Sequence, residues 1–518
     1  MTMSRSLPWL MASLMISPAA LAAPYDLVIN HGHVIDPETE LSDVRHLGIK
    51  DGTIVSVSET PLQGSTSIDA KGLVVTPGFI DLHAHGMEVN DLRMQAMQGV
   101  TTALEMESGV LPIGRWYDIQ AEKALPIHYG AAAAWTFARS AAFMQVEPEP
   151  TVAYFQQAQQ HNNWIEQLAD EEHQARILSL VQTGLDEGAL GIGVNAGYAP
   201  GHGRKEFYQI AKMGADNDVG TFVHTRYASV IERQSTFEAV QELIANAMIL
   251  NSRMHLHHVN STSLKDIDSI IEMLDAALEQ GAPVTIGAYP YGAASTVIGA
   301  AMFRSPDWRA RMQSSAEAFQ LGDERLTEEK FESVREQAPG TFVVWHFLDE
   351  EKPKELAVLD RSIKHPSVLI ESDAMPWMRF TDGGIETYSG DEWPLPADVF
   401  SHPRSAGAFA KVLRSYVRER QLMSLEEAVA KMTLAPAQVM DYVPQMRKKG
   451  RIQPGMDADI VVFDPETIAD RATFQAPNQT AVGVHSLVVN GERVIDNGVL
   501  DTQSRAGQPI RRPQSEAR

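Results

Sequence analysis

Phe79-Ile80-Asp81-Leu82-His83-Ala84-His85-Gly86 follows directly on the apolar run Val74-Val75-Thr76-Pro77-Gly78. This order predicts a hydrophobic strand that ends in two histidines. Side chains on a strand alternate with a period of two, so His83 and His85 are expected to point to the same side. Two neighbouring imidazoles suit one half of a divalent-metal site. The alternative for such a pair is two exposed histidines in a turn.

Seven further strand-like runs follow, and amphipathic stretches such as 236–250 and 264–280 lie between several of them. Alternating β and α segments of this number favour an α/β fold, namely a TIM-like (β/α)8 barrel of parallel strands. A ninth strand-like run, 342–347, makes the number of barrel strands an interpretation. The eight predicted barrel strands are 79–83, 99–107, 127–135, 189–196, 220–226, 254–260, 283–291 and 368–373.

The two ends of the chain have a different character, with short β runs separated by turns. We therefore expect residues 23–73 and 448–502 to form one small β-domain that is split in sequence. Residues 74–447 are predicted to form the barrel. The segment at about 297–341 is long for a loop, so we interpret it as an insertion at the barrel mouth and a candidate lid. The polar end, 503–518, is expected to be a disordered tail.

Composition excludes several kinds of protein. The 518 residues carry a net charge of -24, which argues against a nucleic-acid partner, because such a partner would require basic patches. The chain contains no cysteine. No disulfide can stabilise it, and no thiolate can serve as a nucleophile or a zinc ligand.

Residues 1–22 fit a secretory signal peptide. Arg5 is an early positive charge, residues 7–16 are apolar, and Ala20-Leu21-Ala22 is a small-x-small cleavage site. The apolar run is too short to span a bilayer. We expect a soluble periplasmic or secreted protein with no membrane contact after cleavage, and the alternative is a disordered N-terminal arm.

Histidines and carboxylates gather at the ends of five predicted strands. Active sites of such barrels lie at the C-terminal ends of the strands, and this set of side chains could hold one or two zinc-like ions. Taken singly, a strand-end glutamate is often only solvated, and Asp373 could cap a helix. His255 and His257 share one strand face and His258 takes the other, so not all three can be ligands. The candidates are His83, His85, Glu105, Glu107, His224, His255, His257, His258, Glu371 and Asp373.

With these motifs the chain resembles the amidohydrolase superfamily, and within it the N-acyl-D-amino-acid deacylases, or D-aminoacylases. The resemblance spans roughly residues 25–500. The matching blocks are PGFIDLHAH (77–85), GVTT (99–102), VHTR (223–226), HHVN (257–260), AYPY (288–291), ESD (371–373), HPR (402–404) and GRIQPGMDAD (450–459).

The resemblance implies a metal centre and its base. Asp373 is implied as the metal-associated acid that also serves as the general base. The family places a cysteine ligand after the second strand, where this chain has Ser108 with Glu107 beside it. Because a hydroxyl is a poor zinc ligand and a carboxylate a good one, we expect Glu107 to replace the cysteine and bridge two ions, with Glu105 as the alternative. The implied metal-binding histidines are His83, His85, His224 and His258.

The resemblance also implies residues that bind the substrate carboxylate. Arg404 suits a planar carboxylate through bidentate bonding. The family's lysine after the sixth strand is Asn260 here, so one positive charge for the substrate is missing. The run 189–196 contains no lysine, which argues against a hydantoinase-like or dihydroorotase-like cyclic amidase. The implied substrate-binding residues are Tyr198, Tyr289, Ser295 and Arg404.

These observations lead to a metal-dependent amide hydrolase, in which metal-activated water releases a free D-amino acid from an N-acyl-D-amino acid. The expected cofactor is Zn2+, as one or two ions, and the expected partner is a small-molecule amide. The oligomeric state stays open. One alternative is a related amidohydrolase that acts on a dipeptide or another C–N bond. A second, of another class, is a non-catalytic periplasmic protein that binds a metal or a ligand.

Overall fold

The computed structural model describes residues 24–514 except residue 383. Eight strands form one parallel sheet in the order β17-β12-β11-β10-β9-β8-β7-β6. Backbone hydrogen bonds from His85 N to Ala374 O (2.7 Å) and from Ala374 N to His83 O (3.2 Å) join its two edges. The predicted (β/α)8 barrel is thereby confirmed. Its strands are β6 (Phe79–Asp81), β7 (Val100–Val110), β8 (His128–Ala134), β9 (Gly191–Asn195), β10 (Gly220–His224), β11 (Met254–Leu256), β12 (Val284–Ala288) and β17 (Val368–Ile370).

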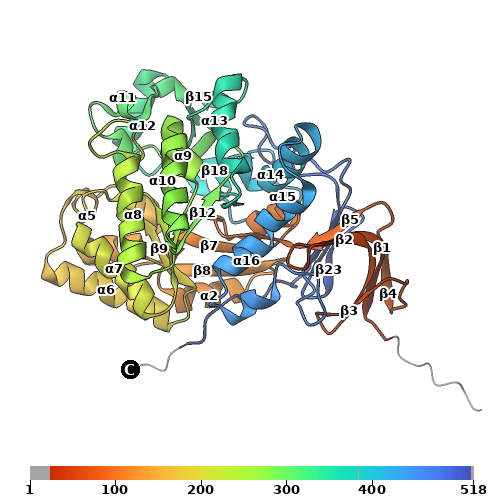
Figure 1. The fold of residues 1–518 in the computed structure, drawn as a ribbon. Coiled ribbons are helices and arrows are strands. Elements are labelled where there is room, and N and C mark those ends of the chain that lie inside the picture. The colour runs from red at the N-terminus through yellow and green to blue at the C-terminus, as the bar shows by residue number, and fades with distance from the viewer. Residues whose placement is uncertain (1–23, 383, 515–518) are drawn as a thin grey trace, which may run out of the picture.

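Helices surround the barrel (Figure 1). Every residue of β8 is buried, as expected in a barrel, where one face of each strand packs in the barrel interior and the other lies under helices. The helices are α1 (Val89–Ala96), α2 (Ile113–Ala121), α3 (Trp135–Met144), α4 (Val152–Ala158), α5 (Asn163–Glu166), α6 (Glu171–Asp186), α7 (Arg204–Asp216), α8 (Thr236–Leu250), α9 (Val259–Ser263), α10 (Ile267–Glu279), α11 (Trp308–Met312), α12 (Glu328–Gln337), α13 (Pro353–Lys364), α14 (Arg404–Lys411), α15 (Leu425–Met432) and α16 (Leu434–Val439).

A second sheet lies beside the barrel and combines both ends of the chain (Figure 1). Its central pairing is antiparallel and joins β21 to β5, with Val461 opposite Thr76. Side chains such as Ile29, Val75 and Val462 form its own apolar cluster. The strands are β1 (Leu27–Asp36), β2 (Leu41–Lys50), β3 (Thr53–Ser58), β4 (Thr66–Asp69), β5 (Val74–Pro77), β21 (Ile460–Phe463), β22 (Val484–Val489), β23 (Glu492–Asp496) and β24 (Val499–Leu500).

The segment that we interpret as an insertion folds into a small sheet with α11 and α12 beside it. The ninth strand-like run is β16 of this sheet and pairs with β13, with Ala294 opposite Trp345. A further three-stranded sheet follows β17. The insertion strands are β13 (Ala293–Val297), β14 (Phe319–Leu321), β15 (Glu324–Arg325) and β16 (Phe342–His346), and the later ones are β18 (Met378–Thr381), β19 (Gly384–Thr387) and β20 (Val399–Phe400).

The end of the chain differs from our expectation of a disordered tail. Up to residue 514 it packs against the barrel, because Ile510 enters the core with 1% of its surface exposed. Ile510 N donates to Tyr129 O at 2.7 Å, and Tyr117 Oη donates to Ile510 O at 2.6 Å. Ala506 is also buried, and the polar composition of the segment conceals these two apolar contacts with the core.

The predicted signal peptide, 1–22, lies outside the described residues, so it stays a prediction. Within residues 24–514, leaving aside residue 383, no helix has the length and apolar character needed to cross a membrane.

A buried carboxylate fastens the small sheet to the barrel. Asp459 precedes β21 and accepts hydrogen bonds from His128 Nε2 of β8 (3.0 Å), from Asn490 N (2.8 Å) and from Lys449 Nζ. Burial alone would raise the pKa of Asp459, but its contacts with His128 and Lys449 hold it far below its usual value. The ionised carboxylate therefore stabilises the folded chain.

Replacement of Asp459 by asparagine is expected to lower the free energy of unfolding by about 3 kcal/mol at pH 7, because Lys449 loses its buried partner and keeps only the partly exposed Asp457, 3.1 Å away. Since the folded-state pKa of Asp459 is depressed, this difference should shrink only as the pH falls below the unfolded-state value of about 3.9. Urea denaturation measures it. The matched control, Asp496→Asn in an exposed pair with Arg493, should cost less than about 1 kcal/mol. Equal losses in the two variants would contradict the account.

Candidate metal centre

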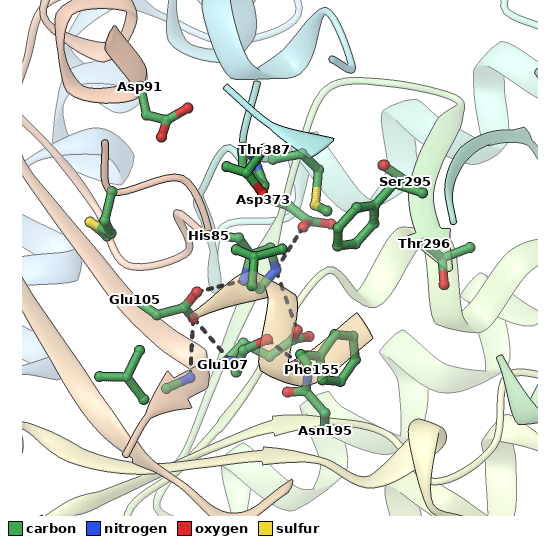
Figure 2. A pocket seen from close by; sticks show the side chains of 18 of the residues that line it. His85, Asp91, Glu105, Glu107, Phe155, Asn195, Ser295, Thr296, Asp373 and Thr387 are labelled. Atoms are coloured by element: carbon green, nitrogen blue, oxygen red, sulfur yellow. Dashed lines mark hydrogen bonds and ion pairs between the residues drawn. The ribbon is translucent and has the colours of Figure 1, made fainter. Parts of the chain in front are cut away.

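Six of the predicted site residues converge at the C-terminal ends of the barrel strands. Five of them line a cavity of about 380 Å3, and the sixth, His83, is fully buried beside them. Figure 2 shows His85 between Glu105 and Asp373 with Glu107 close by. The six come from β6, β7, β10, β11 and β17 or the residues that follow them, as the alternation of barrel strands and helices requires. They are His83, His85, Glu107, His224, His258 and Asp373.

The first half-site consists of His83, His85 and Asp373. The two Nε2 atoms lie 3.1 Å apart. Asp373 Oδ1 lies 3.4 Å from His83 Nε2 and 3.3 Å from His85 Nε2. Glu107 Oε2 approaches the same two nitrogens at 3.5 and 3.6 Å. Two imidazole nitrogens and two carboxylate oxygens thus surround one point.

The second half-site consists of His224 and His258. Their nearest ring nitrogens, His224 Nδ1 and His258 Nε2, lie 3.0 Å apart. Glu107 Oε1 lies 3.2 Å from the first and 2.7 Å from the second. The carboxylate of Glu107 therefore directs one oxygen to each half-site.

The outer nitrogens of the first pair of histidines are held by other carboxylates. His83 Nδ1 lies 3.2 Å from Glu371 Oε1, and His85 Nδ1 lies 2.8 Å from Glu105 Oε2. An imidazole that donates from Nδ1 presents the lone pair of Nε2. Two such lone pairs 3.1 Å apart repel one another unless a cation lies between them. This all-nitrogen and oxygen donor set fits a divalent metal ion.

The pKa shifts of the site residues also favour a cation between the histidines. Burial alone would lower the pKa of His83, but the charges of Asp373, Glu107 and Glu371 raise it well above its usual value. Burial would likewise raise the pKa of Glu107, and His83 and His258 hold it well below its usual value. The carboxylates therefore stay ionised and favour positive charge at the Nε2 atoms.

Two of the candidate ligands adopt a backbone conformation that residues other than glycine rarely take. The φ angles of His258 and Asp373 are 34° and 51°. This left-handed conformation costs on the order of 1–3 kcal/mol and persists only where the surroundings impose it. The His258 amide is held by Glu371 Oε1 at 2.7 Å.

Glu105, the alternative ligand, binds the outer nitrogen of His85 and two backbone amides. Its Oε2 contacts His85, and its Oε1 accepts from Ser108 N at 3.0 Å and Gly109 N at 3.2 Å. Ser108, which stands where the family has a cysteine, accepts a hydrogen bond from Asn195 Nδ2 at 2.8 Å through its Oγ.

The four predicted substrate-binding residues fall into two groups. Tyr198 and Ser295 line the cavity, and Tyr198 Oη lies 2.9 Å from Thr296 Oγ1. Tyr289 and Arg404 are fully buried and do not line it. The Arg404 guanidinium stacks 4.6 Å over the Tyr289 ring and pairs with Asp373 Oδ1 at 2.7 Å.

Sequence reasoning gave Glu371 no role of its own and left His255 and His257 unassigned. In the structure Glu371 contacts both of these histidines and two of the candidate ligands. The sequence feature that could have pointed to Glu371 is Gly287, a glycine inside the neighbouring strand. The structure explains it, because a Cβ at this position would lie only 2.3 Å from Glu371 Oε2.

A (β/α)8 barrel with paired histidines and an aspartate at the C-terminal ends of its strands defines a hydrolase of the metal-dependent class. Residues 66–124 and 151–495 match the sequence profile described as the Amidohydrolase family, and the chain belongs to this family. It is accordingly a hydrolase that acts on carbon–nitrogen bonds.

Characterised relatives cover almost the whole chain. The N-acyl-D-glutamate deacylase of Alcaligenes xylosoxydans xylosoxydans is 26% identical over 521 residues, which cover 95% of this chain and 97% of that protein. The D-aminoacylase of the same organism is 26% identical over 520 residues, which cover 94% and 98%.

Solved structures share the fold. An N-acyl-D-glutamate deacylase from Bordetella bronchiseptica, solved with zinc and a phosphonate that mimics the tetrahedral intermediate, gives a TM-score of 0.73 at 24% identity and covers 94% of this chain and 99% of its own. A D-aminoacylase gives a TM-score of 0.74 at 22% identity and covers 95% and 100%.

Replacement of Glu107 by glutamine is expected to weaken Zn2+ binding by more than about 100-fold, because the amide is uncharged and can offer an oxygen to only one half-site; loss of an outer partner costs only about 10–100-fold. Equilibrium dialysis followed by elemental analysis measures bound metal. In the control, Ser108→Ala, metal content should stay at the wild-type level. Metal loss in the serine variant together with retention in the glutamate variant would show that the ligand had been misassigned.

Proposed function

We propose that this protein uses a divalent metal centre to hydrolyse N-acyl-D-amino acids to a carboxylate and a free D-amino acid.

 The ligands of that centre are nitrogen and oxygen atoms alone. The observation that carries the proposal is the position of Glu107 between two pairs of histidines, with Asp373 at the first pair. The deacylase relatives supply the substrate class.

The six converging residues would hold one or two ions, and Zn2+ is the proposed metal because a related deacylase was solved with zinc. When bound, such an ion lowers the pKa of water and polarises the scissile carbonyl. The chain itself supplies the half-sites, and Glu105 and Glu371 orient His85 and His83 so that each Nε2 faces inward.

Asp373 is the proposed general base. The charges of Arg404 and His83 outweigh its burial and lower its pKa, so its carboxylate is ionised and ready to accept a proton. It takes the proton from the attacking water and passes it to the nitrogen of the leaving amine. Arg404, paired with Asp373 Oδ1, holds the carboxylate toward the two Nε2 atoms.

The cavity walls favour substrates with an apolar group. Among the described residues, Lys123 is the one lysine or arginine that lines the cavity, and its Nζ is paired with Glu88 at 2.8 Å. Asn260, at the position of the family's lysine, donates to Tyr289 O and adds no charge. The apolar wall includes Trp116, Phe137, Phe155, Met302, Phe342 and Trp345.

Replacement of Asp373 by asparagine should lower kcat by between about 100- and 10,000-fold, because the amide accepts no proton at neutral pH. Because the half-site of His224, His258 and Glu107 is untouched, at least one ion per chain should remain by elemental analysis. The control, Asp398→Asn, removes an exposed partner of Arg379 and should leave kcat unchanged. Persistent turnover with a reduced metal content would refute the assignment of the base.

A screen of N-acetyl-D- and N-acetyl-L-amino acids tests the substrate. We expect hydrolysis of the D series, with kcat/KM for N-acetyl-D-phenylalanine at least about 10-fold above that for N-acetyl-D-glutamate, since an acidic side chain would meet no free cation in the cavity. A preference for the L series, or for the glutamate derivative, would contradict this.

Two other functions remain as alternatives to test in the same assays, namely cleavage of a dipeptide or another C–N bond, and metal or ligand binding without catalysis. Binding alone would require the ligands but no base, so the position of Asp373 favours catalysis. We also propose, from residues 1–22, that the protein works in the periplasm or outside the cell.

A further inference from the structure

Glu371 lies behind the metal centre, at the end of β17, and none of its surface is exposed. We propose that Glu371 is a positioning residue that sets the geometry of both half-sites at once, and that His255 and His257 serve to hold Glu371 rather than to bind metal. The inference rests on the proposed metal-dependent function.

One oxygen of Glu371 connects the two half-sites. Oε1 lies 3.2 Å from His83 Nδ1, in the first half-site. The same atom accepts from the backbone N of His258, in the second half-site, at 2.7 Å. It thus orients the ring of one ligand and holds the left-handed backbone of another.

The other oxygen of Glu371 faces two histidines that lie outside the half-sites. Oε2 lies 2.8 Å from His257 Nδ1 and 3.4 Å from His255 Nε2. The far nitrogen of His255, Nδ1, lies 2.8 Å from Thr285 Oγ1. Each ring therefore directs one nitrogen at Glu371, whereas the hydrogen bonds and ion pairs of Glu107 among the described residues are with His83, His85, His224 and His258. We infer from this that His255 and His257 hold Glu371 and are not ligands of the ions that Glu107 would bridge.

A buried carboxylate persists only when its charge is compensated by donors. Glu371 has four groups within 3.4 Å, which come from β6 and β11 or the residues that follow them. The carboxylate is therefore a fixed negative charge beneath the centre.

The neighbouring strand leaves room for this carboxylate. Gly287 of β12 faces Glu371, and a Cβ at this position would lie 2.3 Å from Oε2 and 2.4 Å from Cδ. An alanine here would push the carboxylate away from its partners, since the three atoms nearest to the added Cβ all belong to Glu371. Gly287 therefore offers an independent way to disturb Glu371.

The test compares Glu371→Gln with Glu105→Gln in the full-length protein. Zn2+ alone is titrated in competition with a chromophoric chelator, and activity is not the readout. Because Glu371 contacts both half-sites, its variant should bind both ions about 10–100-fold more weakly. Glu105 contacts only His85 among the ligands, so its variant should weaken one ion and leave the other at wild-type affinity.

Gly287→Ala serves as a second variant if Glu371→Gln fails to fold, as judged by circular dichroism, and it should weaken both ions in the same way. Wild-type affinity for both ions in a folded Glu371→Gln or Gly287→Ala protein overturns the inference, as does loss confined to one ion. If the variants lose both ions but the wild type hydrolyses no N-acyl-D-amino acid, the proposed substrate is wrong and the role of Glu371 stands. A wild-type protein that binds no Zn2+ overturns both.

Discussion

Glu107 carries a negative charge with almost none of its surface exposed, and it lies between two pairs of imidazole rings. A carboxylate in this environment requires partners on both oxygens, because an unpaired buried charge costs several kcal/mol. His83 and His85 face one oxygen, and two further histidines face the other. The strands that carry the four histidines must therefore end close enough to Glu107 for their rings to reach both of its oxygens.

The barrel meets the requirement because parallel strands place their C-terminal ends on one rim. The bonds between His85 and Ala374 bring the first and last strands together, so that Asp373 reaches the histidines of the first strand. Below the rim, Glu371 links the halves of the centre through His83 and the His258 backbone. At Asp459, too, a buried carboxylate with partners from both parts, His128 and Lys449, joins the small sheet to the barrel.

Much of this arrangement could be predicted from the sequence, because it depends on local periodicity. The eight barrel strands follow from apolar runs, and the shared direction of His83 and His85 follows from the period of a strand. The contacts of Glu371 join residues 113 to 288 positions apart, and no local pattern reports them. The packing of the C-terminal segment depends on two apolar side chains, Ala506 and Ile510, in a polar stretch, and composition does not reveal it.

The position of Arg404 illustrates a further limit. The HPR motif indicated a carboxylate-binding arginine, and the structure places that arginine beneath the cavity against Asp373. Whether an arginine faces substrate or a neighbouring acid depends on the side chains around it, and these come from other strands. A motif therefore predicts the residue near the site, while its partner follows from the three-dimensional packing.

Anomalous diffraction from a crystal of the Zn2+-loaded protein, recorded above and below the zinc absorption edge, tests the central claim most directly. The account predicts two peaks, one among His83, His85 and Asp373 and one between His224 and His258, with an oxygen of Glu107 in contact with each. Peaks that lie away from Glu107, or a metal bound by Glu105 or Ser108 in its place, would contradict it.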